Sequence, residues 1–178
     1  MEGIIAELAY GVTINKKSYY HPWEHTERVA EYAKMIMSKE FDYSILSEVL
    51  ISAYFHDTGR LSEPVDYEHG YRSAMLLDMN VDYIPFDFDL ESVRFAVLNH
   101  CHKTGETGWL PIVSNYPRNL DKRIAACLWD ADRLDLLRNP KVDRVRGEFL
   151  NTDYAKSFAN SREHFNYSRY FSAPKLIR

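Results

Sequence analysis

The chain has 178 residues, the length of one domain, and its 46% of hydrophobic residues can bury a substantial core. Its net charge of −4 argues against a general binder of polyanions, and no apolar run approaches the ~20 residues of a membrane-spanning helix. The first ten residues lack the basic start and apolar stretch of a signal peptide, and two cysteines are too few for a disulfide framework or a cysteine-based zinc site. We therefore expect a cytoplasmic protein without membrane contact.

Helical periodicity runs through nearly the whole chain, and loops are expected where Gly, Pro and Asn cluster. Apolar residues recur at three- and four-residue spacing in five segments that we predict to be helices: 24–40, 44–57, 67–79, 90–100 and 119–137. No stretch alternates with period two over six residues, so a sizeable sheet is not expected. The sequence predicts an all-α helical bundle.

The chain is expected to divide into a main domain and a short C-terminal segment. The main domain covers residues 1–151, whereas residues 152–178 combine basic side chains with six aromatic ones. Dense aromatic side chains need a cover. We therefore expect the segment 152–178 to pack on the core or at an interface, for example between two copies of the chain.

Six ionisable residues extend the apolar stripes of the five predicted helices. Each lies three, four, seven or eight residues from an inward position of its own stripe, so all six side chains should point inward. They are His25, His56, Asp57, His69, His100 and Asp132. For the pair in "YFHDTGRL", the alternative is an ordinary helix end beside Gly59, with both side chains in solvent.

Buried ionisable groups are paired or coordinate metals, and these stripes offer no Lys or Arg as partners. A shared cation satisfies all six residues at once. Nitrogen and carboxylate ligands without thiolate suit Mn, Fe, Co, Ni or Zn, with Mg an option at one position. Six ligands with a carboxylate that can bridge are able to hold two ions, so we expect one or two divalent metal ions as the cofactor.

The order of these residues resembles the HD-domain superfamily of metal-dependent phosphohydrolases. The stretches "HPWEHTERVAEYA", "FHDTGR", "DYEHGYRSA" and "CLWDADRLDLLR" resemble a bacterial HD-hydrolase subgroup with a "WDADRLDL" helix, and the resemblance covers roughly residues 20 to 150. It implies an all-α bundle with a first metal held by His25, His56, Asp57 and Asp132. It also implies a second metal on His69 and His100, where two are present, with Asp57 bridging.

The motif "NHCHKTGE" offers two histidines for the second metal. Helix geometry favours His100, because a step of two residues turns the side chain of His102 about 200° away from the stripe. His102 and Lys103 would then lie at the rim of the cleft and contact a phosphate. The alternative for His102 is a helix C-terminal histidine that the helix dipole favours. His21 lies outside the pattern and is expected to be an N-terminal cap or a surface residue.

Arginines near the ligands are candidates for contacts with substrate. We expect substrate-binding roles for Arg28, Arg72, His102 and Arg133, and catalytic roles for His56, Asp57, Arg60 and Lys103. The alternative for the arginines is a solvated helix face. Asp135, one turn after Asp132, is expected to orient a ligand or an arginine rather than to bind metal, and Asp130 is expected to be structural.

These residues together predict a phosphohydrolase that uses a metal-activated water on a phosphate ester or anhydride. The expected substrate is a nucleotide or another small phosphorylated metabolite. One alternative is a nuclease for single-stranded nucleic acid, in which the aromatic and basic segment 152–178 stacks bases. The sequence is also compatible with a non-catalytic module that senses a nucleotide or binds a protein, and with a di-iron oxygenase that has the same ligand pattern.

Overall fold

The computed structural model describes the chain except for residues 20, 63–65, 102–115, 140–141, 160 and 165–178. The described part contains seven α-helices and short 3₁₀ turns, and no strand, which confirms the all-α class. The helices are α1 (Glu2–Val12), α2 (Trp23–Glu40), α3 (Leu46–Phe55), α4 (His69–Asn80), α5 (Leu90–Asn99), α6 (Lys122–Leu134) and α7 (Asp153–Ala159).

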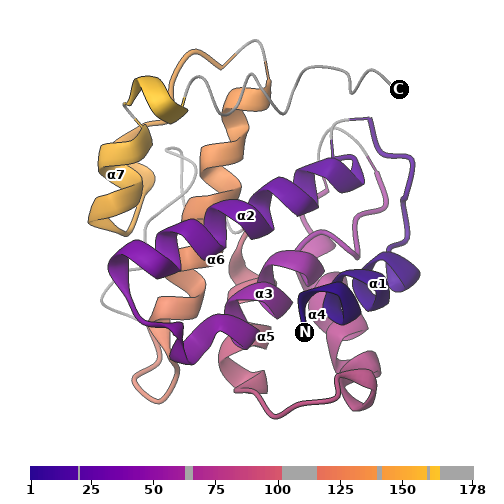
Figure 1. Cartoon of the computed structure of the whole chain (residues 1–178). Coiled ribbons are helices and arrows are strands. Elements are labelled where there is room, and N and C mark those ends of the chain that lie inside the picture. The colour runs from indigo at the N-terminus through magenta and orange to yellow at the C-terminus, as the bar shows by residue number, and fades with distance from the viewer. Residues whose placement is uncertain (20, 63–65, 102–115, 140–141, 160, 165–178) are drawn as a thin grey trace.

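The long helix α2 forms the centre of the bundle. It crosses α6 and packs against α3, while α5 contacts α3, α4 and α6 (Figure 1). α1 covers α3, and α7 lies on the side of α2 and α6 away from α4. The core between these helices is built from side chains at the predicted apolar positions, such as Val29, Ala33, Val49, Val93 and Leu128, all fully buried.

Two glycines allow the backbone to approach helices closely. A Cβ at Gly59 would lie 2.4 Å from the backbone nitrogen of Ser73, and a Cβ at Gly70 would lie 2.6 Å from the carbonyl oxygen of Leu98. Contacts this short exclude a side chain at either position. The turn after α3 therefore lies directly on α4, and the first turn of α4 lies directly on the end of α5.

The described part of the C-terminal segment packs on the core. Ala155 and Phe158 of α7 are buried against α2 and α6, and His164 is fully buried with its ring against Tyr32 and a nitrogen 3.0 Å from the carbonyl oxygen of Leu134. Asp130 of α6 holds the start of this segment, because its carboxylate accepts hydrogen bonds from the backbone and side chains of both Asn151 and Thr152. This contact fits the structural role expected for Asp130. The division into two parts stays a prediction.

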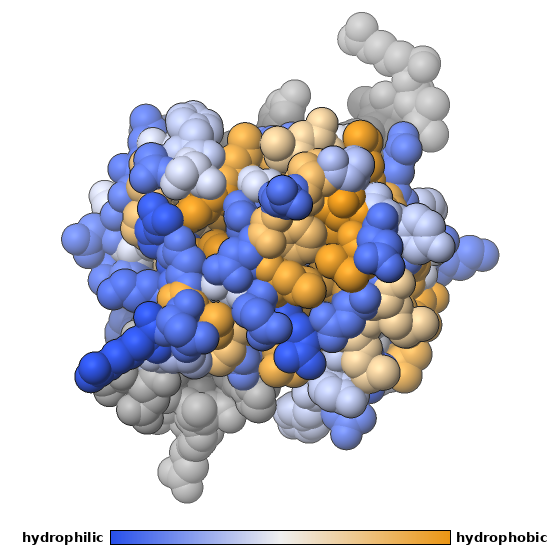
Figure 2. All heavy atoms as spheres, turned by 90° about the horizontal axis from the view of Figure 1, so that it is seen from below, coloured by the Kyte–Doolittle hydropathy of each residue, from blue (hydrophilic) through white to orange (hydrophobic). Residues whose placement is uncertain are grey.

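The surface carries large apolar side chains as well as charges. Figure 2 shows hydrophobic residues that gather on one face among hydrophilic neighbours. On and beside α4, exposed apolar side chains recur every four residues, at Tyr67, Tyr71, Met75, Met79 and Tyr83. No described helix combines the length and the apolar character needed to cross a membrane.

Candidate metal centre

The six predicted ligands lie at or near the ends of five helices, and these ends meet. His25 lies in the first turn of α2, and Asp132 lies near the end of α6. The others are at helix boundaries: His56 and Asp57 follow the last residue of α3, His69 is the first residue of α4, and His100 caps α5. All but Asp132 are buried, and the Asp132 side chain is 19% exposed.

The four imidazoles have their Nδ1 atoms occupied in hydrogen bonds. In three of them the partner is the carbonyl oxygen three residues earlier. The pairs are His56 with Ala53 at 2.7 Å, His100 with Val97 at 2.6 Å, and His69 with Asp66. A carbonyl oxygen can only accept, so these Nδ1 atoms carry the hydrogen. In α3 and α5 the bond also satisfies a carbonyl near the helix end that has lost its usual partner.

The Nδ1 atom of His25 is held by Asp135 instead, at 2.7 Å from Oδ2. Asp135 is almost fully buried and also accepts hydrogen bonds from Arg28, at 2.7 Å and 3.1 Å, and from Arg138, at 3.1 Å. Burial would raise the pKa of Asp135, but His25 and the arginines hold it below its usual range. Asp135 thus contacts His25 and two arginines, which agrees with the orienting role predicted from the sequence. A carboxylate behind a metal-binding histidine is the usual support of such sites.

The four Nε2 atoms therefore remain to face one another and the Asp57 carboxylate at one buried centre. Around His25, the Nε2 atom lies 3.3 Å from Nε2 of His56, 3.4 Å from Oδ1 of Asp132 and 3.6 Å from Oδ2 of Asp57. His56 is also 3.6 Å from the same oxygen of Asp57. That oxygen is buried and has no hydrogen-bond partner among the described residues.

A second group faces the other oxygen of Asp57. The Nε2 atoms of His69 and His100 lie 2.9 Å apart, and they are 3.1 Å and 3.5 Å from Oδ1 of Asp57. The Asp57 carboxylate therefore lies between two groups of imidazoles and turns one oxygen to each. This is the position of a bridging carboxylate.

These spacings fit metal coordination. Ligand atoms at about 2.1 Å from one cation are about 3.0 Å apart in an octahedron and about 3.4 Å apart in a tetrahedron. The measured separations of 2.9–3.6 Å cover that range. Two lone-pair nitrogens at such distances repel each other unless a proton or a cation lies between them. The described residues thus include His/Asp clusters that could hold a metal ion.

The electrostatics of the protein without metal show how strongly these groups depend on each other. Burial lowers the pKa of His56 to about 4. Burial would also lower the pKa of His69, but hydrogen bonds with Asp57 and Cys101 raise it to about 10. For Asp57, burial acts upward, but the surrounding imidazoles and Arg60 hold the pKa well below its usual range.

Arg60 is the predicted catalytic arginine that lies at this centre. Its Nη2 atom is 3.1 Å from Oδ1 of Asp57 and 2.9 Å from Nε2 of His69, and its Nε atom is buried with no hydrogen-bond partner among the described residues. The side chain lines a small polar recess together with Asp57, His21 and Lys16.

The three predicted substrate-binding arginines have protein partners. Arg28 pairs with Asp135, and Arg72 donates to the carbonyl oxygen of Gly59 and to Asp66. Arg133 donates to the carbonyl oxygen of Phe149 at 2.6 Å. These contacts give each arginine a positioning role, and substrate binding by them stays a prediction. The remaining two candidates, His102 and Lys103, lie outside the described residues, whereas His100 lies within the centre.

Two residues at the centre were not among the predicted ligands. His21 was expected to be an N-terminal cap or a surface residue, but it lies with its ring 5.5 Å from that of His25, and its Nδ1 atom is buried without a partner among the described residues. Burial lowers the pKa of His21 to about 3. Cys101 lies beside His69 and His100, and those neighbours outweigh burial and lower the pKa of its thiol to about 7. The four-residue spacing of His21 and His25 was the signal in the sequence that could have placed His21 beside His25. No sequence signal marked Cys101.

No family model matches this chain, and neither a curated protein nor a solved structure does.

Proposed function

We propose that this protein is a metal-dependent phosphohydrolase that hydrolyses a phosphate ester or anhydride of a nucleotide or another small phosphorylated metabolite. The observation that carries the proposal is the convergence of four oriented Nε2 atoms on the two oxygens of Asp57. The resemblance of the sequence to the HD-domain superfamily agrees with this arrangement.

In this proposal His25, His56, Asp57 and Asp132 hold one cation, and His69, His100 and Asp57 hold a second. A bound divalent cation supplies a water of lowered pKa and positive charge that faces phosphoryl oxygens. The protein supplies the orientation, because hydrogen bonds at Nδ1 fix every imidazole before any ligand binds.

Arg60 is the group best placed to contact the phosphoryl group. Its guanidinium is buried beside Asp57, and its Nε–H lacks a partner among the described residues. A phosphoryl oxygen in the recess would accept from that N–H and would add charge stabilisation during the reaction. The exposed edge of the Asp132 side chain gives a second approach from solvent.

The test begins with the protein purified without chelator and a measurement of its metal content. Turnover is then measured with nucleotides, cyclic nucleotides and phosphate monoesters in the presence of Mn²⁺, Co²⁺ or Ni²⁺. Uptake of oxygen by an iron-loaded sample would favour the oxygenase instead, and salt-sensitive binding of single-stranded nucleic acid would favour the nuclease.

Asp57→Asn is the decisive variant. It keeps the shape of the side chain but removes the shared negative charge, so we expect a folded protein that has lost most of its metal and essentially all turnover. Without metal it should be less heat-stable than the metal-free parent, because the buried carboxylate is paired with Arg60 and His69 and these contacts are weakened. The matched control is Asp78→Asn, since Asp78 is a half-exposed carboxylate on α4 that pairs only with Arg94 in the described structure. Normal metal content and normal turnover in Asp57→Asn would overturn the proposal.

A further inference from the structure

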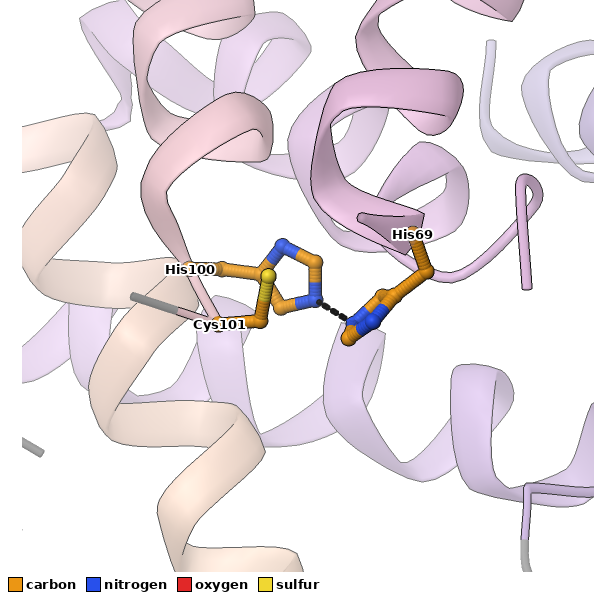
Figure 3. Close-up of side chains that lie close together, drawn as sticks. All are labelled: His69, His100 and Cys101. Carbon is orange, nitrogen blue, oxygen red and sulfur yellow. Dashed lines mark hydrogen bonds between the residues drawn. The ribbon is translucent and has the colours of Figure 1, made fainter. Parts of the chain in front are cut away.

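We propose that Cys101 is a third protein ligand at the His69–His100 position, which would make that position selective for thiophilic divalent cations such as Zn²⁺, Co²⁺ and Cd²⁺. This inference deepens the proposed function and rests on it for the identity of the two metal positions. Figure 3 shows the three side chains gathered where the end of α5 meets the start of α4.

The geometry brings a sulfur to two nitrogens that already face one another. The ligand atoms of His69, His100 and Cys101 all lie within 4.8 Å of one another, and the two Nε2 atoms are 2.9 Å apart. Sulfur and nitrogen bound to one tetrahedral zinc ion are about 3.6 Å apart. A cation would therefore need to draw the thiol inward by at most about 1.2 Å.

Close packing holds the sulfur at this place. Gly70 follows His69 at the start of α4, and a Cβ on it would lie 3.0 Å from Sγ of Cys101 and 2.6 Å from the carbonyl oxygen of Leu98. The absence of a side chain at Gly70 is what lets α4 reach the end of α5. The sulfur also lies 3.9 Å from the carbonyl oxygen of Tyr67, the residue two before His69. The partly buried Cys101 thus contacts the segment that carries His69.

The charges also call for an anion at this position. The first position has two carboxylates, Asp57 and Asp132, beside two imidazoles. The second has two imidazoles and only the shared oxygen of Asp57, and the Arg60 guanidinium lies 2.9 Å from His69. A dication there would meet one shared negative charge and a positive neighbour. A thiolate from Cys101 supplies the missing negative charge.

The added sulfur changes which metals the two positions take. Carboxylate and imidazole ligands accept many first-row divalent ions, whereas thiolate favours zinc and its softer relatives and disfavours Mg²⁺. The two positions should therefore differ in preference, with a harder cation at Asp132 and a softer one at Cys101.

Cobalt titration followed by absorption spectroscopy tests the inference directly. Bound Co²⁺ should give visible d–d bands from the histidine and aspartate ligands and, in addition, a near-ultraviolet charge-transfer band from the thiolate. Cys101→Ser should abolish the charge-transfer band and keep the visible bands. The matched control is Cys127→Ala, because Cys127 is the other cysteine, is buried in α6 and belongs to none of the possible metal-binding clusters among the described residues. It should keep both sets of bands.

Metal competition gives a second measurement that does not depend on activity. Cys101→Ser should weaken the binding of Cd²⁺ by at least about a hundredfold, since even the loss of a supporting hydrogen bond costs about 10- to 100-fold. Its affinity for Mn²⁺ should change little, and circular dichroism should confirm the helical fold of the variant. A charge-transfer band that survives in Cys101→Ser, or visible bands without any charge-transfer band in the parent protein, would refute the sulfur ligand but leave the phosphohydrolase intact. A parent protein that binds no Co²⁺ at all would refute both.

Discussion

Replacing Asp135 by Asn should weaken metal binding although Asp135 is not expected to touch the metal. The new amide can present an NH₂ group to Nδ1 of His25, which would move the ring hydrogen to Nε2 and block the ligand atom. Loss of such a supporting carboxylate costs about 10- to 100-fold in metal affinity, or about 1.4–2.7 kcal/mol. The variant also weakens the buried ion pair of Asp135 with Arg28, whose Nε and Nη2 atoms lie 2.7 Å and 3.1 Å from the carboxylate oxygens. We therefore expect a lower free energy of unfolding as well.

Asp130→Asn is the matched control for this variant, because both carboxylates are buried and lie near the end of α6. Asp130 accepts four hydrogen bonds from Asn151 and Thr152, at 2.7–2.8 Å, and none from a predicted ligand in the described structure. Its replacement should lower stability, as measured by urea unfolding, while metal affinity, as measured by chelator competition, stays unchanged. Wild-type affinity in Asp135→Asn, or an equal loss of affinity in Asp130→Asn, would refute the orienting role.

Two further predictions concern packing and protons. Gly70→Ala should lower the free energy of unfolding by about 1–3 kcal/mol through overpacking. The control Gly11→Ala, with nothing within 4 Å of its Cβ in α1, should raise it by up to about 1 kcal/mol. Equal urea midpoints for the two variants would contradict the close contact of α4 and α5. The pKa of His69 is raised to about 10 in the metal-free protein, so this ring carries a proton at neutral pH that a metal must displace. Metal binding should therefore release protons, and the affinity for metal should rise about tenfold per pH unit between pH 6 and 8. Calorimetry in two buffers of different ionisation enthalpy counts the protons released on metal binding. A count of zero would refute the reasoning.

The sequence predicted which side chains meet at this centre, because they continue the apolar stripes. Periodicity placed His25 and Asp132 on inward helix faces, and it placed His56 and His100 correctly even though α3 and α5 end just before them. Both residues keep right-handed helical backbone angles, so the stripe extends past the last helical residue. Periodicity also chose His100, which the structure places in the centre.

Contacts between distant segments could not be predicted in the same way. The bonds that Asp135 makes with Arg28 join residues more than a hundred positions apart, and nothing in either local pattern marks that pair. Cys101 was set aside because cysteine spacing alone suggested no zinc site, and its place beside His69 depends on how α4 meets α5. Such residues become visible only once the helices are packed.

The distribution of the ligands along the chain has a consequence for synthesis on the ribosome. The proposed metal centre needs His25 of α2 and Asp132 of α6, and α6 leaves the ribosome after most of the bundle has been made. Until then the emerged chain carries the histidines of the earlier helices without the carboxylate of Asp132, so any metal it captures is held by an incomplete set. Productive loading should therefore be a late event that follows the docking of α6 on α2. A stalled nascent chain that ends before α6 would retain metal far more weakly than one that includes it.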